Sequence, residues 1–234
     1  DDASGIAAAH YKCDAAPTSD GDESPGSPVL GDSINSLLGL AVPVQGTHQL
    51  FLWLGDAAGN TDFRNYQFTS QEAFKWDACP PVTSILNRDG IEGCEDWYTS
   101  AVQVTLSAED VNPAPSVINA ISGMSATFWR QDGGNWQQGA IFQVTGEGTR
   151  TFEYYSTDVA GNSETPQMSQ LKIDTVPPTT NPPVYWPNPG ENGWYTATVS
   201  VVLSAIDASS GTSATYYRVN GGAFQLGSEF AVAT

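Results

Sequence analysis

Residues 95–110 read EDWYTSAVQVTLSAED, and residues 192–207 repeat this pattern as NGWYTATVSVVLSAID. In both stretches a Trp-Tyr-Thr triplet is followed by Val and Leu residues that alternate with polar or small residues. Alternation with a period of two predicts a β-strand with one face in a core and the other in water. The repetition itself favours a chain built from several copies of one domain.

Two further motifs recur along the chain. Residues 46–60, GTHQLFLWLGDAAGN, match residues 148–162, GTRTFEYYSTDVAGN, and both end in Asp-x-Ala-Gly-Asn. A Ser-Gly pair, followed by small residues, an aromatic residue and a base, begins at Ser4, Ser122 and Ser210. A period of roughly 90 to 100 residues is too long for a solenoid repeat and is the size of one β-sandwich domain.

The remaining sequence is typical of strands and turns. Asp132-Gly133 and Asn220-Gly221 are dipeptides that adopt the positive φ angles of tight hairpins. No long segment has apolar residues at the i, i+3, i+4 and i+7 spacing of an amphipathic helix. We therefore expect an all-β fold.

Paired prolines mark the predicted domain borders. Residues 77–83, DACPPVT, align with residues 174–180, DTVPPTT. Paired prolines cannot continue a central strand and favour a stiff, extended path, so we interpret both segments as short semi-rigid linkers. The predicted domains are the C-terminal part of one domain, a complete domain and the N-terminal part of a third, at residues 1–76, 77–176 and 177–234. The first includes a long insertion, residues 14–46, rich in Pro, Ser, Asp and Gly, which we expect to be a surface loop.

The order of these motifs resembles the bacterial immunoglobulin-like (Big-like) tandem repeats of surface and secreted proteins, including OmpL47-type repeats. The order is Trp-Tyr-Thr and its alternating strand, Ser-Gly, an aromatic pair, an Asp-Gly-Gly hairpin and Asp-x-Ala-Gly-Asn. The resemblance covers residues 82–234 well and residues 1–75 more loosely. It implies tandem immunoglobulin-like β-sandwich domains and an extracellular or cell-surface location, and it specifies no single function.

The repeat alignment predicts that only the middle domain is complete between Asp1 and Thr234. A half sandwich exposes an apolar face and open strand edges. One explanation is that these residues are a window on a longer array. The other is that the C-terminal half of one molecule completes the N-terminal half of the next by strand addition, which would repeat into an open filament.

The charge is strongly acidic, with 26 Asp and Glu residues against 8 Lys and Arg residues and a formal net charge of −18. Nucleic acids and anionic membrane surfaces both attract Lys and Arg, so this balance argues against either partner. No apolar stretch approaches the length of about 18 residues that a membrane span needs.

Two cysteines are expected to pair. Cys79 and Cys94 of the middle repeat are both replaced at the aligned positions of the third repeat, Val176 and Glu191. Paired partners are lost together, so we predict a Cys79–Cys94 disulfide and an oxidising compartment. Cys13 is left over, and we expect a buried free thiol there.

Four aspartates are candidate oxygen ligands for Ca²⁺ near the domain junctions. Asp56 and Asp158 belong to Asp-x-Ala-Gly-Asn, and Asp110 and Asp207 lie at strand ends. The alternative is that these residues only cap tight turns by binding nearby backbone N–H groups. The sequence leaves both interpretations open and indicates no other cofactor.

Seven tryptophans suggest carbohydrate binding, since sugars stack on flat aromatic faces. Most of them occupy positions that packing explains. Trp76 and Trp186, near the predicted linkers, are the better candidates for exposed ligand contacts. Catalysis has little support, because His10 and His48 lie in predicted strands and no Gly-x-Ser-x-Gly elbow marks a nucleophile.

These patterns indicate a non-enzymatic structural protein of an extracellular stalk, filament or sheath. Its expected partners are neighbouring immunoglobulin-like domains or copies of itself. The alternative is an accessory carbohydrate- or adhesion-binding module of a larger secreted enzyme or adhesin.

Overall fold

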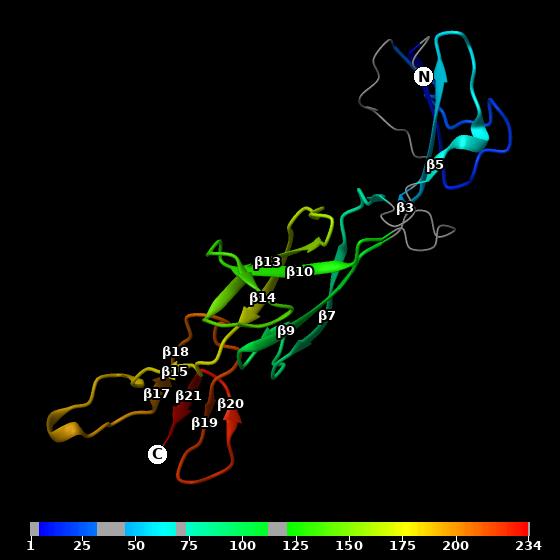
Figure 1. Ribbon diagram of the computed structural model, residues 1–234. Coiled ribbons are helices and arrows are strands. Elements are labelled where there is room, and N and C mark those ends of the chain that lie inside the picture. Colours follow the sequence, from blue (N-terminus) through cyan, green and yellow to red (C-terminus); the bar gives the residue numbers. More distant parts are fainter. Residues whose placement is uncertain (1–4, 32–44, 69–73, 112–120, 234) are drawn as a thin grey trace. The chain divides into compact units, whose positions relative to one another are not determined.

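The computed structural model describes residues 5–31, 45–68, 74–111 and 121–233 (Figure 1). In these residues the fold is all-β, as expected, and two single-turn 3-10 helices interrupt the strands, η1 (Phe63–Asn65) and η2 (Glu191–Gly193). Nothing helical in the described ranges is long and apolar enough to cross a membrane.

The chain divides into two compact units. The first contains residues 1–83, 108–127 and 155–165, and the second contains residues 84–107, 128–154 and 166–234. This division passes through the middle repeat, whereas the sequence places domain borders near residues 76 and 176. Those borders remain predictions.

The first repeat forms two small sheets. One has the strand order β2-β1-β4-β5, and the other pairs β3 with β6. The strands are β1 (Ile6–Cys13), β2 (Val29–Leu30), β3 (Gly46–His48), β4 (Leu50–Asp56), β5 (Gln67–Phe68) and β6 (Phe74–Trp76). Ala9 and Tyr11 of β1 are buried, as are Phe51 and Trp53 of β4.

Part of the predicted surface loop packs along β1 instead of standing free. The amide N–H of Ser24 donates to the carbonyl of Tyr11 (3.0 Å), and the amide N–H of Cys13 donates to Oγ of Ser24 (2.9 Å). The hydroxyl of Tyr11 donates to the carbonyl of Pro25 (2.6 Å). Residues 14–31 therefore cover one part of this sheet, and residues 32–44 of the predicted insertion lie outside the described residues.

The middle repeat has a fold of the β-sandwich type. A five-stranded sheet has the order β11-β10-β13-β14-β8, and a three-stranded sheet has the order β12-β9-β7. The strands are β7 (Val82–Asp89), β8 (Trp97–Tyr98), β9 (Val102–Glu109), β10 (Met124–Gln131), β11 (Gln137–Gln138), β12 (Ile141–Val144), β13 (Gly148–Asp158) and β14 (Gln167–Ile173).

The main core lies between the inner faces of these two sheets. In β9, Val102, Val104 and Leu106 are at most 4% exposed, which confirms the alternation read from the sequence. They pack with residues of β12, β13 and β14, among them Phe142 and Phe152, whose rings meet edge to face at 5.6 Å.

The third repeat contains three small sheets. β15 (Thr179–Thr180) pairs with β18 (Ala205–Ile206), and β19 (Tyr216–Tyr217) pairs with β20 (Gln225–Leu226). The third sheet has the order β16-β17-β21, with β16 (Val184–Trp186), β17 (Val199–Val202) and β21 (Glu229–Val232).

Strand pairing follows the sequence repeat residue by residue. Val102 lies opposite Val144 in the middle repeat, and the aligned Val199 lies opposite Val232 in the third. The ring stacks also recur: Trp129 on Phe142 has a centroid distance of 4.2 Å, and Tyr217 on Phe230 has one of 4.0 Å. The register of the β3–β6 pair, Gly46 opposite Trp76, likewise matches Gly148 opposite Ile173.

Candidate functional site

Asp77 and Asp174 begin the two Pro-Pro segments and make the same contacts. One oxygen of each carboxylate accepts the amide N–H two residues along the chain, at 3.1 Å in both cases. The other oxygen accepts the amide N–H of the serine in the next Ser-Gly motif, Ser122 for Asp77 (2.7 Å) and Ser210 for Asp174 (3.0 Å). Each aspartate thus ties a predicted linker to the repeat that follows it.

The same segments are also held to the repeat that precedes them. Oε1 of Gln45 accepts the amide N–H of Ala78 (2.9 Å), and Oε2 of the aligned Glu147 accepts the amide N–H of Thr175 (2.9 Å). The hydroxyl of Thr175 also donates to Glu147. We call each set of contacts, made around Asp77 or Asp174, a junction clamp.

Both clamp aspartates are stabilised in the charged form. Burial would raise the pKa of Asp77, but hydrogen bonds from Ser122 and from the amide of Cys79 outweigh it and lower the pKa. The hydrogen bond from Ser210 is the main cause of the lowered pKa of Asp174. Both side chains therefore accept hydrogen bonds as carboxylates at neutral pH.

An acidic cluster lies at the first clamp. One carboxylate oxygen from each of Asp77, Asp110 and Asp158 lies within 4.8 Å of the other two. Oδ2 of Asp110 accepts the amide N–H of Gly123 (2.6 Å), whereas its Oδ1 is buried and has no hydrogen-bond partner within the described ranges. Asp158 is 3% exposed and accepts the amide N–H groups of Gly161 and Asn162.

The other two candidate ligands are placed differently. Asp56 makes the same turn contacts as Asp158, accepting the amide N–H of Asn60 at 2.8 Å, and it belongs to no group of three ligand residues among those described. Asp207 accepts the amide N–H of Gly211 (2.9 Å) and lies beside Asp174 at the second clamp. The structure thus brings together two of the four predicted residues, Asp110 and Asp158.

Asp77 is the member that sequence reasoning missed. It lies at the start of a Pro-Pro segment, aligned with Asp174, and this alignment was the available signal. Three convergent carboxylates are a ligand set suited to a hard cation such as Ca²⁺, which prefers oxygen ligands. Backbone capping explains most of the oxygen contacts in the cluster, but it does not account for Oδ1 of Asp110.

Trp76 and Trp186 differ in their surroundings. Trp76 is 42% exposed and lines a groove of about 670 Å³ at the first clamp, together with Thr47, Lys75 and Ser122. Trp186 is 72% exposed on β16. Both are accessible to a ligand, and Trp76 is the one for which a groove is found.

The predicted Cys79–Cys94 disulfide is wrong for this structure, in which all three cysteines are free. Cys79 precedes β7 and Cys94 follows it. An extended eight-residue strand advances the chain by roughly 26 Å, so the Cα separation of about 4.4 to 6.8 Å that a disulfide needs would require the flanking residues to fold back along it. Nε2 of Gln45 donates to Sγ of Cys79 instead (2.9 Å).

No family model matches this chain, and no curated protein matches it either.

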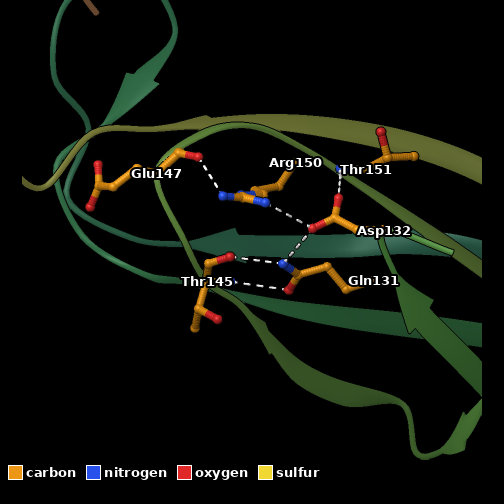
Figure 2. A network of polar contacts seen from close by, with 6 residues as sticks. All are labelled: Gln131, Asp132, Thr145, Glu147, Arg150 and Thr151. Atoms are coloured by element: carbon orange, nitrogen blue, oxygen red, sulfur yellow. Dashed lines mark hydrogen bonds and ion pairs between the residues drawn. The ribbon is translucent and has the colours of Figure 1, made fainter. Parts of the chain in front are cut away.

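A further polar network closes one end of the middle repeat. Figure 2 shows Arg150 donating to Asp132 (3.2 Å) and to the carbonyl of Glu147 (2.6 Å), while Asp132 accepts the amide N–H of Thr151 (3.0 Å). Nε2 of Gln131 joins the same network by donating to Asp132 (3.0 Å), and the side chain of Gln131 also binds the backbone of Thr145. Because the side chain of Glu147 holds Thr175, the network extends to the second clamp.

The first repeat has an equivalent of this network, built on a histidine. Asp14, aligned with Asp132, accepts the amide N–H of Gln49 (3.1 Å), and its other oxygen lies 2.9 Å from Nδ1 of His48. His48 is aligned with Arg150. The second histidine, His10, lies 2.8 Å from Glu23. Both histidines therefore pair with carboxylates of the segment that follows β1.

Proposed function

We propose that this chain is a non-enzymatic structural protein, part of an extracellular or cell-surface stalk, filament or sheath built from tandem immunoglobulin-like domains. The observation that carries the proposal is the junction clamp, which occurs twice with the same contacts at aligned residues. A binding site for a single ligand does not need to recur at both predicted repeat borders. A stiff array, in contrast, needs the same joint at each border.

The clamp opposes bending at the predicted linkers. A hydrogen bond to a charged group is stronger than one between neutral groups, and each clamp aspartate accepts two of them. The paired prolines restrict the same segment by fixing φ. The resulting array is stiff at its joints, as a stalk requires.

Calcium at the acidic cluster would strengthen the first joint. Asp77 belongs to the clamp, and Asp110 and Asp158 belong to the following repeat, so a bound cation would link them while neutralising three like charges. Millimolar Ca²⁺ outside cells suits a site with few protein ligands. Such a site would fit the proposed extracellular location.

The test of the mechanical proposal is limited proteolysis at the Pro-Pro segments. With both clamps intact, residues 77–83 and 174–180 should resist cleavage, because their backbone is held on two sides. The double variant D77A/D174A should be cut at both segments, and the matched variant D56A should not. Rapid cleavage of the unmodified chain at either segment would contradict a stiff joint.

The alternative is a carbohydrate- or adhesion-binding module, and the groove beside Trp76 favours it. An exposed indole next to Lys75 and Thr47 offers a stacking face and hydrogen-bonding groups. Pull-down on insoluble polysaccharide separates the two functions. Retention that is lost in W76A or W186A would favour the module, and an absence of retention would favour the structural role.

A further inference from the structure

A pocket of about 430 Å³ lies beside the edge of the five-stranded sheet in the middle repeat. β8 pairs with β14 only at Lys172 and Ile173, so within the described residues β14 has no strand neighbour on this side before Lys172. Residues of the hairpin that leads into β8 line the pocket together with this part of β14. We call it the hairpin pocket, and its lining includes Arg88, Glu92, Asp96, Trp97, Gln170 and Lys172.

Trp97 provides the aromatic surface of the hairpin pocket. The strand register places Trp97 next to Lys172, and Lys172 next to Thr149 of β13. Leu171 and Ile173, on either side of Lys172, are at most 4% exposed, so the row of three lies on the outer face of the sheet. Nζ of Lys172 lies 6.0 Å from the centre of the Trp97 ring. The pocket therefore combines an indole with a flexible cation on the solvent side of the sheet.

Four charged side chains line the hairpin pocket without pairing. Arg88 and Lys172 are cations, and Glu92 and Asp96 are anions. None of the four forms an ion pair with a residue that the structure describes. The guanidinium of Arg88 donates to Oγ of Ser169 (2.9 Å), and Lys172 donates to a backbone carbonyl at 3.5 Å. Most donors and acceptors of these four groups are therefore left for water or a ligand.

Asp96 occupies the pocket at a conformational cost. Glu95 and Asp96 are the central residues of a tight turn, with φ angles of 53° and 64°, which the amide N–H of Trp97 closes (3.1 Å). The aligned residues of the third repeat, Asn192 and Gly193, are the pair that such a turn favours. Gly adopts this left-handed conformation without the steric cost that Asp bears. Strain that persists at the rim of a pocket points to a role for the Asp96 side chain in binding.

We propose that the hairpin pocket binds a neutral sugar residue of a glycan. A sugar ring can stack its C–H groups on an indole, and each of its hydroxyls donates one hydrogen bond and accepts others. The free donors and free acceptors around Trp97 match such hydroxyls. The volume of the pocket is within the range of about 300 to 1,000 Å³ that is typical of small-molecule sites.

Charge selects an uncharged ligand. The two cations and two anions of the pocket cancel, so no net charge attracts an ion. The whole chain has a formal net charge of −18, which repels an acidic polysaccharide before it reaches the pocket.

This site goes beyond the proposed stalk, which needs no ligand. It is also separate from the two tryptophans considered above, since Trp76 lines another groove and Trp186 lies on β16. Through the hairpin pocket, a stalk or sheath would adhere to a surrounding polysaccharide.

NMR titration of the ¹⁵N-labelled, 234-residue chain tests the proposal. The neutral probes are cellohexaose, xylohexaose, mannohexaose and hexa-N-acetylchitohexaose, and the acidic probe is hexagalacturonate, each added to millimolar concentration. At least one neutral probe should shift, in a saturable way, the indole N–H signal of Trp97 and the amide signals of residues 92–97 and 170–172. Hexagalacturonate should leave these signals unchanged.

D96G is the most informative variant. It removes a carboxylate from the pocket and places Gly where the third repeat has it, so the melting temperature should not fall. The affinity for the neutral probe should nevertheless fall at least about tenfold. E95N is the matched control, because Glu95 has the same left-handed conformation in the same turn but does not line the pocket, and its affinity should be unchanged. K172A, at an exposed position, removes a donor and should also weaken binding.

The inference is overturned if no neutral probe shifts these signals, if hexagalacturonate alone shifts them, or if D96G or K172A binds as tightly as the unmodified chain. Shifts confined to Trp76 or Trp186 would also overturn it and would favour the binding module instead. None of these results affects resistance of the Pro-Pro segments to proteolysis, so the stalk proposal is tested separately.

Discussion

Asp77 and Asp174 show how one residue type is used for the same task in successive repeats. Each carboxylate accepts one N–H from its own segment and one from the next repeat, and hydrogen bonds lower the pKa of both. The Pro-Pro alignment predicted where these residues lie. It did not predict their partners. These are the backbone amides of Ser122 and Ser210, which lie far away in the sequence, and a backbone amide is present whichever side chain the residue carries.

At the residue scale, Asp22 gives a prediction about pH. Lys12 donates to it at 2.6 Å and Thr18 also donates, and these hydrogen bonds, that of Lys12 first, lower the pKa of Asp22 from 3.8 to about 2. A lowered folded pKa means that the charged form stabilises the fold above pH 3.8. This contribution should be lost as pH falls from 3.8 to about 2. NMR titration should find the low pKa, and K12M should raise it; an unchanged value in K12M would contradict the assignment.

The acidic cluster gives a second prediction at this scale. Added Ca²⁺ should raise the melting temperature of the unmodified chain, because a ligand that binds only the folded state stabilises it. D110N should abolish most of this increase by removing a ligand with a buried, unpartnered oxygen. D56N should leave it intact, since Asp56 caps the same kind of turn outside the cluster. A melting temperature that Ca²⁺ and chelator leave unchanged would remove the calcium proposal.

At the scale of the element, β4 and β13 are aligned but bury opposite faces. In β13, Phe152 and Tyr154 are buried, whereas in β4 the intervening Phe51 and Trp53 are. The sequence predicted both strands but could not choose the buried face of β4, because residues 50–54, LFLWL, are apolar at every position. In β9 strict alternation defined the face, and the prediction was confirmed.

The two aligned phenylalanines of β12 and β21 give a matched pair of variants. F142A removes a side chain that is 5% exposed and should lower the free energy of unfolding by about 3 to 5 kcal/mol. F230A should cost only about 1 kcal/mol, because Phe230 is half-buried and little additional area is lost. Urea unfolding of both variants measures the difference. Equal losses would contradict the difference in burial between Phe142 and Phe230.

At the scale of the whole molecule, internal repetition was the most informative signal. It predicted the all-β class and aligned residues whose strand registers and ring stacks then proved equivalent. It did not predict that residues 14–31 pack along β1, since an insertion absent from the other repeats has nothing to align with. It also led to a wrong disulfide, because joint loss of two cysteines carries no information about distance.

The stiffness of the joints is the central claim, and ¹⁵N relaxation on the unmodified chain tests it most directly. If the clamps hold, amides of the middle and third repeats should share one slow rotational correlation time, and D174A should shorten that of the third repeat alone. If the two repeats of the unmodified chain already tumble with separate, shorter correlation times, the clamps do not fix the joint and the stalk proposal is contradicted.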